Sequence, residues 1–370
     1  MNKIFNKLKT ADKVDRESNF ELLRILAMFL IVLHHCNVHG VFSYLQKNPS
    51  VTYINNELVS FFLSSGGKIG VSLFVLLTGY FCCTKSFNPK KWLNVYLQTL
   101  FFSVLILVSW FFISPELASK AIQISVMPFV NNSYWFITSW LLLYLFSPAL
   151  NIISQKSSSA TIRNYLFLGI ALWVVLPALE INAPGLSYLT YFMYLYLLGA
   201  AIKLNHISFS KKKLLWLTLA IFCFVFIMVT KEIFFSNTAV NLWKTTSSYT
   251  SLCSPYTLII SLYIFYVFKD LKIKISFVNW IATSMFGVYL LHDNVLVRPW
   301  LWHKMLGMDT YMNSPVFIII SILISVCVFV VCTIIDKILY VFYKPFINST
   351  EKFLSRFYKK SIPDKQVSTN

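Results

Sequence analysis

Two side chains in the first long apolar run of the 370-residue chain have the chemistry of a proton-transfer site. Arg24 and His35 are eleven positions apart (24 to 35), which on an α-helix is about 1100°, close to three whole turns. We therefore expect both on one helix face, with His35 about 16 Å further along the axis. Histidine titrates near neutral pH and serves as a general base, whereas arginine is a permanent cation that binds anions.

Other ionisable residues in apolar runs are candidates for function, because such groups are costly in hydrocarbon. His292 and Asp293 lie near the end of a late run, and Lys68 enters the second run. If the N-terminus is cytoplasmic, His35 and His292 both lie in the outer half of the membrane. Simpler roles are open as well. Arg24 and Lys68 can reach lipid headgroups, and the histidines can hydrogen-bond a neighbouring helix or sit at an interfacial helix end.

The elements that position these residues are predicted to be membrane-spanning helices. Hydrophobic residues make up 57% of the chain and charged residues only 12%, whereas a soluble domain has roughly a quarter charged residues. A spanning helix needs about 20 apolar residues. Ten such runs occur, at 20–40, 59–83, 93–114, 134–153, 164–180, 187–203, 214–231, 252–268, 277–297 and 315–343. They predict an all-α polytopic bundle over residues 20–345, between a basic segment 1–19 and a polar, basic tail 346–370.

The net charge of +18 reflects topology. With a cytoplasmic N-terminus, the outer loops hold only Lys47, Lys120, Lys231, Lys244, Arg298 and Lys304 of the 32 lysines and arginines. An excess of basic residues on one side predicts that both termini are cytoplasmic. We therefore expect membrane lipid as a partner and no nucleic acid. The seven cysteines lack zinc-site or redox spacing, so we expect no metal site.

Several segments together resemble the bacterial acyltransferase-3 family, whose members are integral membrane proteins that O-acylate surface carbohydrates. In that pattern the arginine and histidine of the first helix match Arg24 and His35. The other similar segments are Arg16–Asn19, Glu21–Leu23, Gly70–Phe81, Ser133–Ile137, Leu143–Pro148 and Ser284–His292. One feature differs, because many members have Arg-x-x-Arg after the second helix. This chain has only Lys85, Lys90 and Lys91 there, and lysine is a point charge without the arginine fork.

The resemblance implies a multi-pass enzyme of the bacterial plasma membrane that uses acyl-CoA, most simply acetyl-CoA, and no permanently bound cofactor. His35 would be the general base for a carbohydrate hydroxyl, and a covalent acyl-histidine relay is the less favoured route. We expect Arg24, Lys90 and Lys91 to bind the donor. His292, Trp135, Tyr134 and Lys68 are the candidates for binding the acceptor, a surface polysaccharide or lipid-linked glycan.

A second function stays open from the sequence. Arg24 and His35 could line the substrate or proton path of a non-catalytic exporter or flippase of a polysaccharide or its lipid-linked precursor. Polysaccharide-assembly proteins would be partners in either case. The sequence does not define the sugar, the hydroxyl position or the acyl group.

Overall fold

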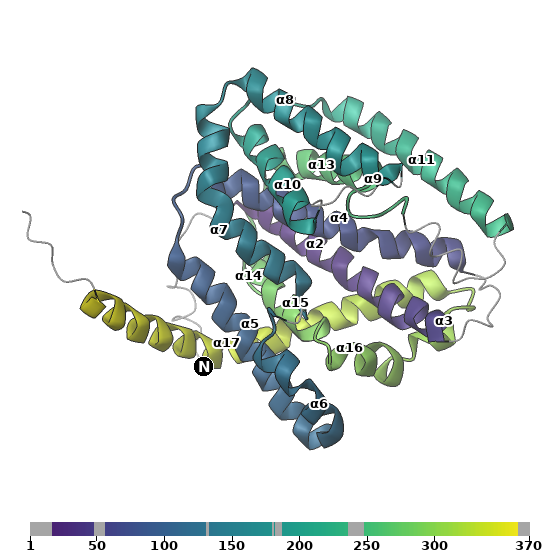
Figure 1. Cartoon of the computed structure of the whole chain (residues 1–370). Helices are drawn as coiled ribbons and strands as arrows, with labels where there is room; N and C mark the ends of the chain where they lie inside the picture. Colours follow the sequence, from purple (N-terminus) through teal and green to yellow (C-terminus); the bar gives the residue numbers. More distant parts are fainter. Residues whose placement is uncertain are drawn as a thin grey trace, which may run out of the picture.

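The chain folds into a bundle of helices (Figure 1). The computed structural model describes residues 17–47, 56–130, 133–179, 181, 187–235 and 248–361, with side chains up to 350. These residues contain helices and no strand, which confirms the predicted all-α fold. The α-helices are α2 (Ser18–Asn37), α3 (Ser43–Lys47), α4 (Glu57–Cys82), α5 (Pro89–Ile113), α6 (Pro115–Val126), α7 (Trp135–Lys156), α8 (Ser159–Ile170), α9 (Leu176–Ala178), α10 (Tyr188–Lys203), α11 (Lys211–Phe235), α13 (Pro255–Lys269), α14 (Ser276–Ala282), α15 (Met285–His292), α16 (Val297–Pro299) and α17 (Phe317–Ser361). Three π-helical turns, η1 (Val38–Phe42), η2 (Ala171–Val175) and η3 (Trp300–Met305), and one 3-10 turn, η4 (Met308–Tyr311), interrupt or join them.

Seven stretches among the described residues are long and apolar enough to cross a membrane, which agrees with a polytopic membrane protein. They are Ser18–Lys47, α4, α5, α7, Ser159–Ala178, α11 and the Phe317–Thr350 part of α17, and each coincides with a predicted run. The other three runs form the shorter helices α10 and α13 and the broken pair α14–α15.

Local signals explain why α10 and α13 are short. α10 starts with a capping box between Ser187 and Thr190, which satisfies backbone donors at the helix start, and Asn205 follows its end with a positive φ of 59°. α13 begins with Ser254 as N-cap and Pro255 in the first turn, a sequence typical of a helix start. Both helices therefore begin at residues with clear start signals, and α10 also ends at one.

Helix α2 lies at the centre of the bundle and contacts α4, α13, α14, α15 and α17 (Figure 1). Its most extensive contact is with α4, and glycines make the close approach possible. A Cβ on Gly70 would collide with the carbonyl oxygen of Ala27, and one on Gly67 would collide with the ring of His34. Small residues allow such close backbone packing between membrane helices.

The start of α2 is tied to the segment that joins α13 to α14. The Asn19 side chain donates hydrogen bonds to the carbonyls of Phe268 (3.0 Å) and Lys269 (3.3 Å), and the Ile275 N–H donates to Ser18 Oγ (3.0 Å). These contacts give Ser18 and Asn19 a structural role at the N-terminal end of α2.

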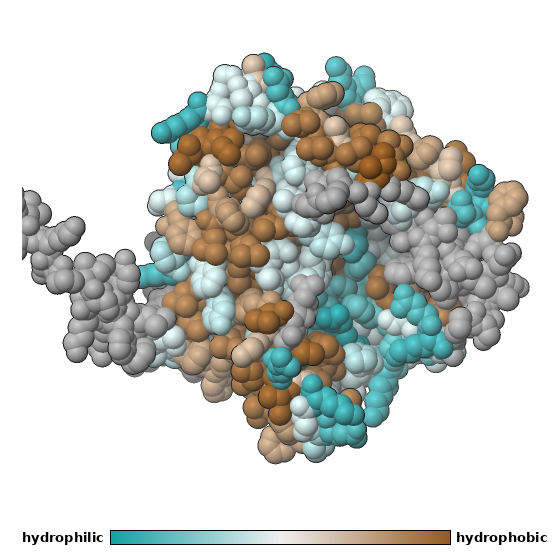
Figure 2. All heavy atoms as spheres, in the orientation of Figure 1, coloured by the Kyte–Doolittle hydropathy of each residue, from teal (hydrophilic) through white to brown (hydrophobic). Residues whose placement is uncertain are grey.

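The outer surface of the bundle is largely apolar, as expected for contact with lipid. Figure 2 shows hydrophobic residues over much of the visible face, with hydrophilic residues near α8 at the top and near α16 at the lower right. On α11, for example, Trp216 (63% exposed) and Ile227 (61%) point outward.

The predicted boundary of the bundle lies close to a helix start at the N-terminal end, but not at a helix end at the C-terminal end. α2 begins at Ser18, close to the predicted 20, whereas the boundary at 345 falls within the continuous helix α17. The C-terminal part of α17 projects beyond the bundle (Figure 1). Residues 1–16 and 362–370 lie outside the described residues, so the cytoplasmic placement of the termini stays a prediction.

Candidate functional site

His35 and His292 meet inside the bundle. His35 lies near the end of α2 and is 9% exposed, and His292 is the last residue of α15 and is fully buried. The Nδ1 atom of His35 lies 2.9 Å from Nε2 of His292. The neighbouring His34 points to a different partner, the carbonyl of Ser64 on α4. Of the two adjacent histidines, it is therefore His35 that joins the buried cluster.

The hydrogen bonds determine where the protons lie on these two rings. His292 Nδ1 is 2.6 Å from the carbonyl oxygen of Val288. A carbonyl only accepts, so His292 Nδ1 carries the hydrogen and its Nε2 is an acceptor when the ring is neutral. His35 must then donate from Nδ1. The lone pair of neutral His35 is consequently on Nε2, on the far side of the ring from His292.

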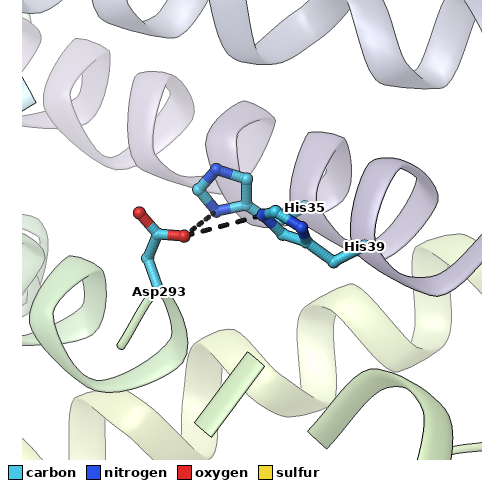
Figure 3. A group of neighbouring side chains, drawn as sticks. All are labelled: His35, His39 and Asp293. Atoms are coloured by element: carbon cyan, nitrogen blue, oxygen red, sulfur yellow. Dashed lines mark ion pairs between the residues drawn. The ribbon is translucent and has the colours of Figure 1, made fainter. Parts of the chain in front are cut away.

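Asp293 contacts three cationic or ionisable side chains through one oxygen. Its Oδ1 lies 3.5 Å from His35 Nδ1, 3.7 Å from His39 Nε2 and 3.1 Å from Arg298 Nε, and the carboxylate is 2% exposed. Figure 3 shows the two imidazoles on the same side of Asp293. Arg298 also donates to the carbonyls of Asp293 (2.8 Å) and Ser133 (3.2 Å). The buried carboxylate is therefore paired with charge, as burial requires.

His39 and Arg298 were not among the candidates that the sequence indicated. The signal for His39 was present, because a histidine four residues after His35 falls on nearly the same helix face. Arg298 counted only as a basic residue of an outer loop. The structure places both against Asp293, which comes from the segment after α15.

His35, His39 and Asp293 also have the donors of a metal site, since their ligand atoms lie within 4.8 Å of one another. The surroundings of Asp293 fit a metal ion poorly. The same oxygen that would be a ligand lies 3.1 Å from the guanidinium of Arg298, so a divalent ion there would stand beside a fixed positive charge. A hydrogen-bonded imidazole pair accounts for the cluster with fewer unfavourable charges.

A cavity of about 280 Å³ lies further toward the start of α2, between α2, α4, α5, α7 and α15. Arg24 and Lys91 are its two basic lining residues. Arg24 is held by Glu21, with 2.6 Å between Nη1 and Oε1, and its guanidinium lies over the ring of Phe81. The Lys91 ammonium lies 5.1 Å from the centroid of Tyr144. We call this space the inner cavity. It brings together two of the three residues expected to bind the donor.

The third expected donor residue, Lys90, does not line the inner cavity. It lies in the first turn of α5, where its backbone N–H donates to the side chain of Asn88 (3.0 Å), and its side chain is exposed. Neighbouring residues on a helix point about 100° apart. Lys91 and Lys90 therefore face different surroundings.

The structure places Arg24 and His35 differently with respect to the inner cavity. Arg24 lines the inner cavity and His35 does not. The wall residue that contacts the histidine pair is Tyr289, whose ring centroid lies 6.3 Å from that of His292. Tyr289 therefore lies between the inner cavity and the histidine pair, although periodicity placed Arg24 and His35 on one side of α2.

The other residues predicted to bind the acceptor have structural contacts. Tyr134 is 1% exposed; its hydroxyl donates to the Leu290 carbonyl (3.0 Å) and accepts from Asn294 (2.8 Å). It therefore supports the segment that carries Asp293. Lys68 is only partly buried by surface area, and its ammonium lies 6.0 Å from the centroid of Trp135, a distance at which cation–π attraction is weak.

Comparison with known proteins gives one match. A family model described as an acyltransferase domain matches residues 17–334, which includes every residue of the histidine cluster and of the inner cavity. No curated protein and no solved structure matches the chain.

Proposed function

The chain belongs to this acyltransferase family, and from that premise we propose that it transfers an acyl group from cytoplasmic acyl-CoA to a carbohydrate hydroxyl. We take the acyl group to be acetyl and the acceptor to be a cell-surface or lipid-linked glycan at the bacterial plasma membrane. The observation that supports this assignment best is the bond between His35 Nδ1 and His292 Nε2. It leaves His35 Nε2 with a lone pair for a substrate proton.

The proposed reaction is direct transfer. The acceptor oxygen attacks the thioester carbonyl carbon while His35 Nε2 takes the hydroxyl proton. The carbon–sulfur bond then breaks, and the thiolate of coenzyme A recovers that proton from His35. No net charge is left on the protein. Between the two steps His35 is an imidazolium, and the carboxylate of Asp293, 3.5 Å from Nδ1, stabilises that charge.

The inner cavity is the proposed place for the donor. Arg24 and Lys91 supply positive charge to an otherwise apolar, aromatic wall, which suits a ligand with a phosphorylated, charged end and a neutral arm. Glu21 orients the Arg24 guanidinium. Both lysines are exposed at the start of α5, but only Lys91 lines the cavity, so Lys90 would contact the donor only outside it.

Transfer requires the acyl carbon to come within reach of His35. Tyr289 separates the inner cavity from the histidine pair in this structure, so its side chain must move when the acyl arm enters. A closed wall would also keep water away from the thioester until the donor is in place.

The test is transfer of radiolabelled acetyl groups from acetyl-CoA to glycan in membranes that contain the full chain. We expect labelled glycan with the wild type and a loss of about 10²–10⁴-fold with His35→Ala, the range for removal of a general base. His206→Gln is a matched control, because His206 binds Ser159 and the Ser154 carbonyl, away from the cluster. Undiminished labelling with His35→Ala would refute the base assignment. Glycan export without any acylation would instead favour the exporter.

A further inference from the structure

A second cavity, which we call the outer cavity, lies beyond the histidine cluster and is separate from the inner one. It measures about 180 Å³ and shares no lining residue with the inner cavity. Its lining is polar on most sides and consists of His39, Ser43, Lys47, Val295, Arg298, Pro299 and His303. None of these residues has a role in the donor site.

Two residues that line the outer cavity, His39 and Arg298, are linked to the proposed base through Asp293. His39 follows His35 by four positions, about 6 Å along the helix axis. Both His39 and Arg298 line the cavity and contact Asp293 Oδ1, which lies 3.5 Å from His35 Nδ1. A ligand held in the outer cavity therefore lies one helical turn from the base, on the opposite side from Arg24.

The charges that face the outer cavity favour an anion. Of the seven described residues that line it, Lys47 and Arg298 are basic and none is acidic. Two nearby carboxylates do not line the cavity but contact residues that do. Asp293 pairs with Arg298 (3.1 Å), and Asp309 contacts His303 (3.3 Å). Guanidinium and ammonium groups bind carboxylate and phosphate oxygens through charge-assisted hydrogen bonds.

Two π-helical turns build the walls of the outer cavity. η1 contains His39 and leads directly into Ser43, and η3 contains His303. Such wide turns occur mostly as single insertions in helices and often at functional sites. Gly40 in η1 allows the close approach of Met308, because a Cβ there would collide with the Met308 side chain. The cavity is thus formed by two π-helical turns, and the packing of Met308 against Gly40 holds η1 in place.

We propose that the outer cavity binds an anionic group of the carbohydrate acceptor, either the carboxylate of a sugar acid or a phosphate attached to the sugar. This inference rests on the proposed acyl transfer and adds the chemical class of its acceptor. The anion is held by Arg298 and Lys47, while an adjacent neutral hydroxyl of the same sugar extends toward His35.

The experiment measures binding to the full chain, purified and reconstituted in phosphatidylcholine nanodiscs, with radiolabelled glucuronate as the probe. Inorganic phosphate and glucose serve as competitors. We expect saturable glucuronate binding that glucose does not compete. A lower Kd for glucuronate than for phosphate identifies a sugar acid, and the reverse order identifies a phosphorylated acceptor. Glucose binding equal to glucuronate binding overturns the inference.

Two variants locate the anion. Arg298→Lys keeps the charge but removes the guanidinium fork, and we expect it to weaken glucuronate binding about tenfold. Lys47→Met should weaken binding less, because Lys47 is exposed. The matched control is Lys304→Met, since Lys304 is an exposed lysine of η3 that does not line the cavity. Equal effects of Lys47→Met and Lys304→Met would refute binding in the outer cavity.

A negative result in the binding assay and one in the transfer assay refute different claims. If acetyl transfer occurs but no anion binds, only the class of acceptor is wrong. If glucuronate binds at Arg298 but no acetyl is transferred to any glycan, the proposed reaction is wrong and the anion site remains.

Discussion

His35 Nδ1 and His292 Nε2 are 2.9 Å apart although the two residues are separated by 257 positions in the chain. Because the Val288 carbonyl accepts a hydrogen bond from His292 Nδ1, the contact between the two rings gives neutral His35 a defined tautomer, with its hydrogen on Nδ1. As in other sites with a catalytic base, a second group holds the base ring in one orientation. If His35 is the base, as proposed, His292 acts as a positioning residue and not as the base.

Replacement of His292 should lower turnover without weakening substrate binding. In His292→Gln we expect kcat to fall by at least tenfold, but less than in His35→Ala, because His35 keeps its ring and loses only its orientation. KM for acetyl-CoA should stay unchanged, since His292 does not line the inner cavity. Steady-state acetyl transfer in membranes measures both constants. A raised KM with normal kcat would mean that His292 binds substrate instead.

Adjacent lysines should differ in their effect on the donor. Lys91→Met removes a basic residue of the inner cavity and should raise KM for acetyl-CoA about tenfold, the usual effect of losing a hydrogen bond to a charged group. Lys90→Met should leave this KM within about twofold. Equal effects of the two substitutions would show that the donor is bound outside the inner cavity.

Removal of the wall between cavity and base should admit water. In Tyr289→Ala we expect hydrolysis of acetyl-CoA to increase relative to glycan acetylation, because an open wall exposes the thioester before the acceptor arrives. The ratio of free acetate to acetylated glycan is the measurement. Tyr289→Phe keeps the ring and should keep the ratio of the wild type; an increase in that variant would point to the hydroxyl and away from the wall.

The contact between α2 and α4 should be sensitive to a single methyl group. A Cβ at Gly70 meets the backbone carbonyl of Ala27, whereas a Cβ at Gly66 lies 3.2 Å from the end of the flexible Leu30 side chain. Overpacking of this kind costs about 1–3 kcal/mol. Gly70→Ala should therefore lower the Tm of the detergent-purified protein, and Gly66→Ala should lower it less. The opposite order would contradict the assigned packing.

Metal chelation should have no effect on acetyl transfer. The Asp293 oxygen that could serve as a ligand is paired with Arg298, and the proposed steps need only an imidazole. Activity after dialysis against EDTA and 1,10-phenanthroline is the measurement. Loss of activity that returns on addition of Zn²⁺ would assign a metal to His35, His39 and Asp293, whose ligand atoms are close enough to hold one.

Much of the fold was predictable because lipid requires long apolar helices. All ten predicted runs contain helices in the described residues. The break between α14 and α15 falls at the polar pair Thr283 and Ser284, but the residues on either side of the pair are apolar enough that the whole segment 277–297 reads as one run. Helix length in this run is decided by tertiary packing, which hydropathy does not report.

The candidate site was predictable only where it depends on a single helix. Periodicity placed Arg24 and His35 on one side of α2, and His292 was identified by the cost of a buried ionisable group. Their partners required the three-dimensional structure. The pairing of His292 with His35 joins α15 to α2, and the contacts of Asp293 with His35 and His39 join the segment after α15 to α2 and η1. No local pattern specifies such contacts.

The long separation of the paired histidines has a consequence for biosynthesis. α2 is inserted into the bilayer early in translation, whereas α15 leaves the ribosome only after most of the chain has been made. Until then His35 has no imidazole to orient it and no carboxylate to stabilise its charge. If His35 is the base, as proposed, a nascent chain or one truncated before α15 should therefore be inert.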